Sequence, residues 1–171
     1  MFINFIRQQL LIMKNIITFF LLFSFVLSIN GQEVDSFKSK DGTEIFFQQF
    51  GDSGETIVLL SGGPGLNPYY LEPLYNELSK KYKCILLHQR GTGESILDEV
   101  NQESLTVQKY IDDLNGLYKK LGNEKLVLVG HSWGGMLSFS YAANEPDKVK
   151  KIILLNTGGV TDAFYTWFGS N

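Results

Sequence analysis

Short apolar runs from residue 56 onward predict buried strands. Three such runs occur, at Thr56–Leu60, Cys84–Leu87 and Leu126–Val129, and Val149–Leu155 gives one more expected strand. Uninterrupted apolar runs of this length are typical of strands that are covered on both faces of a sheet. Two extended runs that are more polar, 34–38 and 43–50, precede these apolar runs. Because Asp41-Gly42 lies between these two runs, we expect an antiparallel hairpin with a two-residue turn.

The segments between the buried strands carry apolar residues at helical spacing. The clearest helix face follows Thr106 and consists of Val107, Tyr110, Ile111, Leu114, Leu117, Tyr118 and Leu121. Thr106 suits the N-cap of this helix, and Gly122 suits its end. Similar spacing predicts helices over 71–82 and from 133 to about 144, before Pro146. Strand and helix therefore alternate, which predicts an α/β fold with a mostly parallel sheet and helices on both faces.

The N-terminal segment has a different pattern from the rest. Arg7 and Lys14 are its only charges, and residues 16–29 form an uncharged run of 14 residues. A basic head followed by a short apolar run is typical of a secretory signal peptide, whereas a membrane-spanning helix needs about 20 apolar residues. We expect residues 1–31 to be a signal peptide and the protein to be periplasmic or extracellular. Two alternatives remain, an uncleaved N-terminal membrane anchor and a true start at Met13.

Composition narrows the classes of function. Hydrophobic residues make up 44% of the chain and charged residues 19%, which is typical of a globular protein. The net charge is -3, and no block of like charge occurs, so we expect no nucleic-acid partner. The single cysteine, Cys84, excludes an internal disulfide and lies in an apolar run, so we expect a buried thiol.

One motif in the sequence indicates chemistry. Residues 130–134 read Gly-His-Ser-Trp-Gly, which matches the pattern Gly-x-Ser-x-Gly between a predicted buried strand and a predicted helix. In that setting the serine lies on a tight strand-to-helix turn with its hydroxyl exposed above the sheet. Side chains at Gly130 and Gly134 would clash with this turn. The helix N-terminus also favours negative charge that develops beside it. We therefore predict that Ser132 is a nucleophile.

A serine nucleophile needs donors for the oxyanion that forms during its attack. The backbone N–H of Trp133, next to Ser132, is one candidate, and the loop Ser61–Gly65 after an earlier strand supplies the other, for which we favour Gly63. This loop is not a phosphate-binding loop, because no Gly-Lys-Ser/Thr follows it. Gly91-x-Gly93 lacks the third glycine of a dinucleotide site. We expect no metal and no cofactor, and we interpret Arg90 as part of a structural ion pair.

Together these motifs resemble the prolyl aminopeptidase (proline iminopeptidase) branch of the α/β-hydrolases. That branch carries His-Gly-Gly-Pro-Gly, Asp-Gln-Arg-Gly-x-Gly-x-Ser and Gly-Gly-Ser-Trp-Gly-Gly, which this chain matches in order at 61–65, 88–95 and 130–135. Ser61 replaces the motif's histidine, His88 its aspartate and His131 a glycine. The resemblance covers about residues 35–160 and implies an α/β-hydrolase fold, of which this chain is the N-terminal part.

The catalytic triad of this fold runs in the order serine, acid, histidine. The chain has two histidines, His88 and His131, and both precede Ser132. In the resembling branch, the acid and the histidine follow a helical cap and further strands. We therefore expect residues 32–160 to be the N-terminal portion of the hydrolase core, 161–171 to be the start of a missing cap, and the chain to be incomplete and inactive.

Three functions remain open. The resemblance implies an aminopeptidase that acts on small peptides. The motifs fit an esterase or lactonase equally, with an ester as the substrate. The missing histidine favours a third reading, a non-catalytic relict or binding module. The sequence leaves the oligomeric state open.

Overall fold

The computed structural model describes residues 7, 13–14 and 34–159. The chain divides into two units, Met1–Gly31 and Gln32–Asn171, and the fold belongs to the second. The predicted signal peptide and the predicted start of a cap lie outside the described residues, apart from Arg7, Met13 and Lys14. Within the described ranges, no helix is both long and apolar enough to cross a bilayer.

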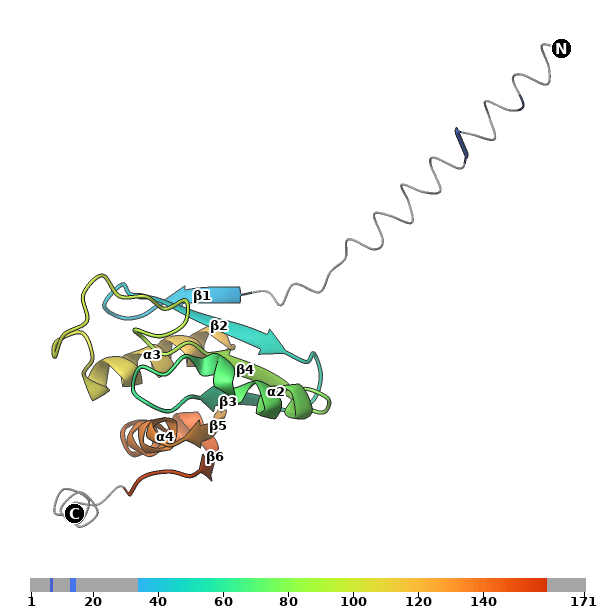
Figure 1. Cartoon of the computed structure of the whole chain (residues 1–171). Coiled ribbons are helices and arrows are strands. Elements are labelled where there is room, and N and C mark those ends of the chain that lie inside the picture. The colour runs from blue at the N-terminus through green and yellow to red at the C-terminus, as the bar shows by residue number, and fades with distance from the viewer. Residues whose placement is uncertain (1–6, 8–12, 15–33, 160–171) are drawn as a thin grey trace. The chain divides into compact units, whose positions relative to one another are not determined.

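A six-stranded sheet in the order β1-β2-β4-β3-β5-β6 forms the centre of the second unit (Figure 1). The strands are β1 (Val34–Lys38), β2 (Glu44–Phe50), β3 (Thr56–Leu60), β4 (Lys83–Leu87), β5 (Leu126–His131) and β6 (Val149–Leu155). β4, β3, β5 and β6 are parallel to one another, and β1 and β2 form an antiparallel hairpin beside β4. The structure therefore confirms the predicted mostly parallel sheet that opens with a hairpin.

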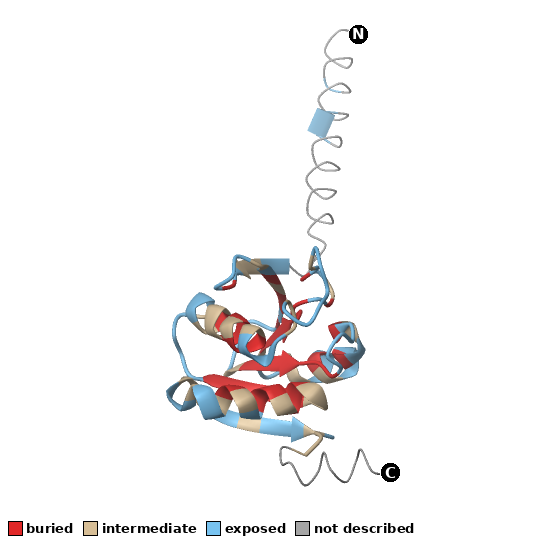
Figure 2. Cartoon of the chain, turned by 90° about the vertical axis from the view of Figure 1, so that its left-hand side faces the viewer, coloured by how far each residue is buried: buried red, intermediate tan, exposed pale blue. Residues whose placement is uncertain are grey.

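Helices cover both faces of the sheet, as predicted. On one face, α3 (Val107–Lys120) and α4 (Trp133–Asn144) pack on a core that includes Val58, Ile85 and Leu128. On the other face, the 3-10 turn η1 (Pro68–Leu71) and α2 (Glu72–Leu78) pack on alternate residues of the same strands. A second 3-10 turn, η2 (Pro146–Lys148), follows α4. Figure 2 shows the buried residues concentrated in the central strands and on the inward sides of the helices.

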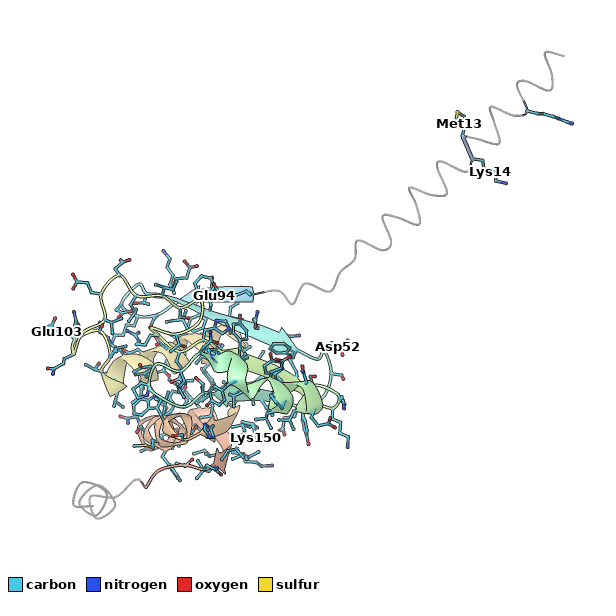
Figure 3. The ribbon with its side chains drawn as sticks, viewed as in Figure 1. Met13, Lys14, Asp52, Glu94, Glu103 and Lys150 are labelled. Atoms are coloured by element: carbon cyan, nitrogen blue, oxygen red, sulfur yellow. The ribbon has the colours of Figure 1, made fainter. Side chains whose placement is uncertain are left out.

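Several charged side chains lie at the surface, outside this core. The labelled Asp52, Glu103 and Lys150 lie at the periphery of the second unit (Figure 3), and all three are exposed. Cys84 is fully buried, as predicted. Burial raises the pKa of its thiol to about 11, so the side chain remains a neutral, apolar part of the core.

The turn of the first hairpin differs from the prediction. The last paired residues are Lys38 and Glu44, so the connection spans residues 39–43 and is longer than the expected two-residue turn. Within this connection, the Asp41 carboxylate accepts a hydrogen bond from the Thr43 N–H and pairs with Arg90. The connection between β1 and β2 thus contributes a carboxylate that pairs with the buried Arg90.

Strand pairing brings the three sequence motifs to one edge of the sheet. β3 lies between β4 and β5, and Leu60 is in register with Gly130. The residues that follow β3, β4 and β5 therefore emerge side by side at the carboxyl ends of neighbouring parallel strands. This edge is where ligands bind in open α/β sheets.

Candidate active site

Ser132 lies at a sharp corner between β5 and α4. Its backbone has φ 51° and ψ -115°, a conformation that costs a non-glycine residue about 1–3 kcal/mol. The corner is held because the Ser132 N–H donates to the Leu155 carbonyl at 3.0 Å, and the Ser132 carbonyl accepts from the Gly135 N–H at 3.0 Å. The side chain is half-buried and has no hydrogen-bond partner among the described residues. The described residues thus leave the hydroxyl unengaged.

The two glycines of the motif are required by close backbone contacts. A Cβ on Gly130 would lie 2.4 Å from the Gly134 carbonyl oxygen. A Cβ on Gly134 would lie 2.2 Å from the Leu60 carbonyl oxygen. Both contacts confirm the clash that the sequence predicts, and they show that α4 begins directly against the end of β3.

The loop after β3 lies beside Ser132. A Cβ on Gly62 would be 3.2 Å from the Cβ of Ser132. The backbone N–H groups of Gly63 and Trp133 have no partner among the hydrogen bonds of the described residues. Gly63 has φ +120°, which favours glycine. The structure therefore places both predicted oxyanion donors in segments that border the Ser132 corner, and their role stays a prediction.

Tyr70 completes this side of the site, and sequence analysis missed it. Its hydroxyl accepts a hydrogen bond from the Gly62 N–H at 2.6 Å and lies 2.7 Å from Nδ1 of His131. The rings of Tyr70 and His131 also meet edge to face, with centroids 5.5 Å apart. The Gly62 N–H is therefore occupied, and the His131 ring interacts with Tyr70. Helical spacing could not reveal Tyr70, because it is exposed in a 3-10 turn.

Gln89 lies on the opposite side of the loop and was also missed. Its side-chain amide donates to the backbone oxygen of Ser61 at 2.8 Å, and its oxygen accepts from the indole N–H of Trp133 at 3.0 Å. The side chain is 3% exposed. One glutamine thus connects the loop after β3 with the first residue of α4.

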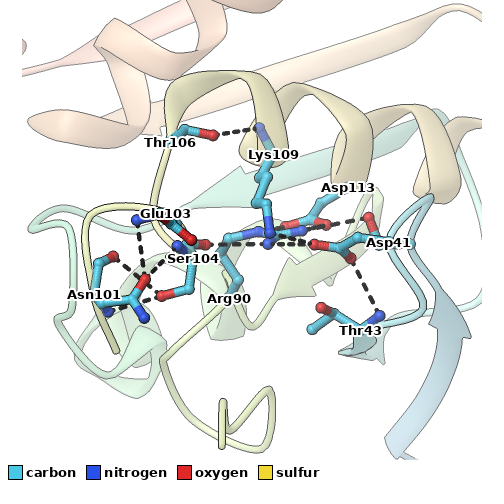
Figure 4. Close-up of polar contacts among 10 residues, drawn as sticks. Asp41, Thr43, Arg90, Asn101, Glu103, Ser104, Thr106, Lys109 and Asp113 are labelled. Carbon is cyan, nitrogen blue, oxygen red and sulfur yellow. Dashed lines mark hydrogen bonds and ion pairs between the residues drawn. The ribbon is translucent and has the colours of Figure 1, made fainter. Parts of the chain in front are cut away.

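Arg90 forms a buried ion-pair network, as predicted (Figure 4). Its Nε donates to Asp113 at 2.7 Å, and its NH1 donates to Asp41 at 3.1 Å. Lys109 also pairs with Asp41, at 3.0 Å. Burial by itself would raise the pKa of Asp41, but hydrogen bonds from Arg90, Lys109 and Thr43 outweigh it and hold this pKa well below its ordinary value. The network is structural and joins the first hairpin to α3.

His88 is fully buried at the end of β4. Its Nδ1 accepts a hydrogen bond from the Glu94 N–H at 3.0 Å, and its Nε2 has no partner in the described part of the chain. Burial lowers the pKa of the imidazole, although the charge of Glu94 opposes the change. His88 is therefore a neutral core residue, and it makes no hydrogen bond to Ser132 in the described part of the chain. Over residues 7, 13–14 and 34–159 no group of three potential metal ligands is present.

Comparisons with known proteins agree with this geometry. Residues 55–168 match the family described as alpha/beta hydrolase fold. The chain is 34% identical over 123 residues to cis-3-alkyl-4-alkyloxetan-2-one decarboxylase of Shewanella oneidensis, covering 71% of this chain and 38% of that protein. It is 35% identical over 121 residues to a proline iminopeptidase of Lactobacillus helveticus, covering 68% and 41%. The chain thus spans about two fifths of the length of these relatives.

A solved structure shows the same arrangement. A thermophilic esterase from Thermogutta terrifontis superposes with a TM-score of 0.62 and 30% identity, over 73% of this chain and 46% of the esterase chain. The match covers a large part of the described unit, which contains the motifs at the carboxyl ends of β3, β4 and β5.

Proposed function

The chain belongs to the alpha/beta hydrolase family, which matches residues 55–168, and from that premise we propose that Ser132 is the nucleophile of a serine hydrolase. The observation that carries the proposal is the corner at Ser132, with φ 51° between a buried strand and a helix. A strained residue at such a turn presents its side chain above the sheet. The absence of a hydrogen-bond partner for this side chain among the described residues leaves the hydroxyl free to react.

In the proposed reaction, Ser132 Oγ attacks the carbonyl carbon of an ester or amide. The N–H groups of Gly63 and Trp133 stabilise the oxyanion, and each such donor is worth ~10²–10³ in turnover. The bond from the carbonyl carbon to the leaving group then breaks, and the leaving group takes the serine proton. Water releases the acyl group from Ser132.

A base that accepts the serine proton would accelerate this step. His131 interacts with Tyr70, and His88 is fully buried and makes no hydrogen bond to Ser132 among the described residues. No histidine follows Ser132 in the 171 residues. We therefore assign the nucleophile and the oxyanion donors to this chain.

For the substrate, we propose the N-terminal residue of a small peptide. The three motifs resemble those of proline iminopeptidases, and a protein of that name is 35% identical to this chain. A second candidate is an ester or lactone. It is favoured by the 34% identity to a decarboxylase of an oxetan-2-one, which is a four-membered cyclic ester, and by Ser61 and His88, which replace residues of the peptidase motifs.

Two measurements test the proposal. A fluorophosphonate should react with Ser132, whose oxygen displaces fluoride from phosphorus while solvent takes the serine proton. We expect one probe per wild-type chain and none in Ser132→Ala; equal labelling of both would contradict the proposal. Proline β-naphthylamide and p-nitrophenyl esters then separate the two candidate substrates, since cleavage of the esters alone would remove the peptidase assignment.

A further inference from the structure

We infer that Gln89 is a positioning residue that holds both oxyanion donors in place beside Ser132. The inference rests on the proposed function and extends it to the motif at residues 88–95, which the chemistry above does not use. Gln89 follows β4, whereas Gly63 follows β3 and Trp133 begins α4. The side chain therefore bridges the two segments that supply the donors.

The bridge consists of hydrogen bonds on both ends of one amide. Nε2 of Gln89 donates to the Ser61 carbonyl at 2.8 Å and lies 3.1 Å from the Ser61 hydroxyl. Oε1 accepts from Nε1 of Trp133 at 3.0 Å. Because the side chain is 3% exposed, water competes little for these bonds.

Only a side chain with both a donor and an acceptor can make this bridge. A glutamate could accept from Trp133, but as a carboxylate it would have no proton to donate to the Ser61 carbonyl. A methionine would fill a similar volume and make neither bond. The choice of glutamine is thus explained by the two partners, and not by packing alone.

The two residues that Gln89 binds, Ser61 and Trp133, lie at or near the oxyanion donors along the backbone. Ser61 lies two residues before Gly63. A Cβ on Gly134 would lie 2.7 Å from the Ser61 carbonyl oxygen, so the first turn of α4 packs against the same group that Gln89 binds. The Trp133 ring meets Tyr110 of α3 edge to face, with centroids 5.5 Å apart. With the ring held by α3, the bond to Gln89 sets where the loop lies relative to α4.

The first test measures fluorophosphonate labelling of Ser132 in the full chain. We expect Gln89→Met and the milder Trp133→Phe to react about 10- to 100-fold more slowly than wild type, because a displacement of about 1 Å costs up to about 10²-fold. Gln48→Met is the matched control. Gln48 is a second buried glutamine, 7% exposed, on β2. Circular dichroism would verify that each variant is folded. Labelling of Gln89→Met at the rate of Gln48→Met would overturn the inference.

A second readout does not depend on reactivity. In ¹⁵N-labelled protein, we expect Gln89→Met to move the Trp133 indole resonance and to broaden or double the amide resonances of Gly63 and Trp133, while Gln48→Met leaves all three unchanged. If wild-type protein took up no probe, the nucleophile assignment would fail, and these resonances would still decide on Gln89. Single, sharp amide resonances for Gly63 and Trp133 in Gln89→Met would refute the bridge.

Discussion

At the scale of the residue, the site depends on backbone conformations that few side chains allow. Ser132 has a positive φ although it is not a glycine. Gly130 and Gly134 leave no room for a Cβ. These three residues form the corner, and the backbone conformation at each of them limits which side chain the position can carry. A strained corner persists only because the surrounding strands and helix determine its path.

Adding a methyl group at Gly134 should therefore disrupt the corner. The new Cβ would meet the Leu60 carbonyl oxygen at 2.2 Å, so backbone must move. We expect Gly134→Ala to lower the free energy of unfolding by about 1–3 kcal/mol or more, as measured by urea denaturation. Gly122→Ala is the control, because no atom lies within 4 Å of its added Cβ and only its φ of +89° is unfavourable. Equal losses in both variants would show that the close contact is unimportant.

The pH dependence of labelling reports whether a histidine serves Ser132. With His131 bound to Tyr70 and His88 buried, the serine proton must go to solvent. We expect the rate of fluorophosphonate labelling, corrected for Ser132→Ala, to rise about tenfold per pH unit from 6 to 9. A histidine base would instead give a plateau above its pKa, ordinarily about 6.5. A plateau between pH 7 and 8 would show that this reading of the two histidines is wrong.

At the scale of the element, the buried Arg90 joins segments that the sheet alone does not connect. Its guanidinium binds Asp113 on α3, Asp41 in the turn between β1 and β2, and the Ser104 carbonyl before α3. The ring of Tyr110 lies 6.0 Å from the guanidinium carbon and also contacts Trp133. The first hairpin is thus linked through α3 to the residue beside Ser132.

Acid should weaken the link made by Asp41. Because its folded-state pKa is lowered, Asp41 stabilises the folded state fully above its unfolded pKa of about 3.9 and loses this contribution as pH falls toward the folded value. We expect Asp41→Asn to be less stable than wild type by about 1–2 kcal/mol at pH 7, with the difference shrinking below pH 4. Urea denaturation at pH 7, 4 and 2.5 measures both. A difference that is constant across this range would exclude an ionised Asp41 as the cause.

At the scale of the whole molecule, the second unit is covered unevenly. The strands β3, β4 and β5 have helices on both faces and are almost fully buried. β6 is an edge strand, and its Ile153 and Leu154 are 41% and 40% exposed. An apolar groove of about 230 Å³ runs beside Ile153 between the sheet and α2, lined also by Leu74, Leu78 and Val127. Exposed apolar edges favour association.

A charge on this edge should reduce self-association. We expect Ile153→Lys to lower the concentration-dependent increase in apparent mass, measured by sedimentation velocity, because a lysine on an edge strand disfavours strand pairing. Val100→Lys is the matched control, since Val100 is 68% exposed in a loop. If both variants associate as wild type does, the edge of β6 is not the contact.

The sequence by itself determined the order of the elements, the hydrolase fold and the place of the Ser132 corner. The order of the elements depends on local periodicity, the corner on the residues next to Ser132, and the hydrolase fold on the resemblance of three short motifs to a known family. Boundaries were accurate where a cap marks them, as at Thr106 and Gly122 of α3. The predicted two-residue hairpin turn was wrong, and Asp41 in the longer connection binds Arg90, 49 positions away, which the local sequence does not display.

Only the tertiary structure decided which side chains surround the corner. The bonds of Gln89 join residues 28 and 44 positions apart, and the contact of Tyr70 with His131 spans 61. Such pairs form because β3 lies between β4 and β5, which brings the motifs to one edge of the sheet. Apolar periodicity specifies that a strand is buried but not which strand lies beside it, so the neighbours of Ser132 follow from strand order and not from spacing along the chain.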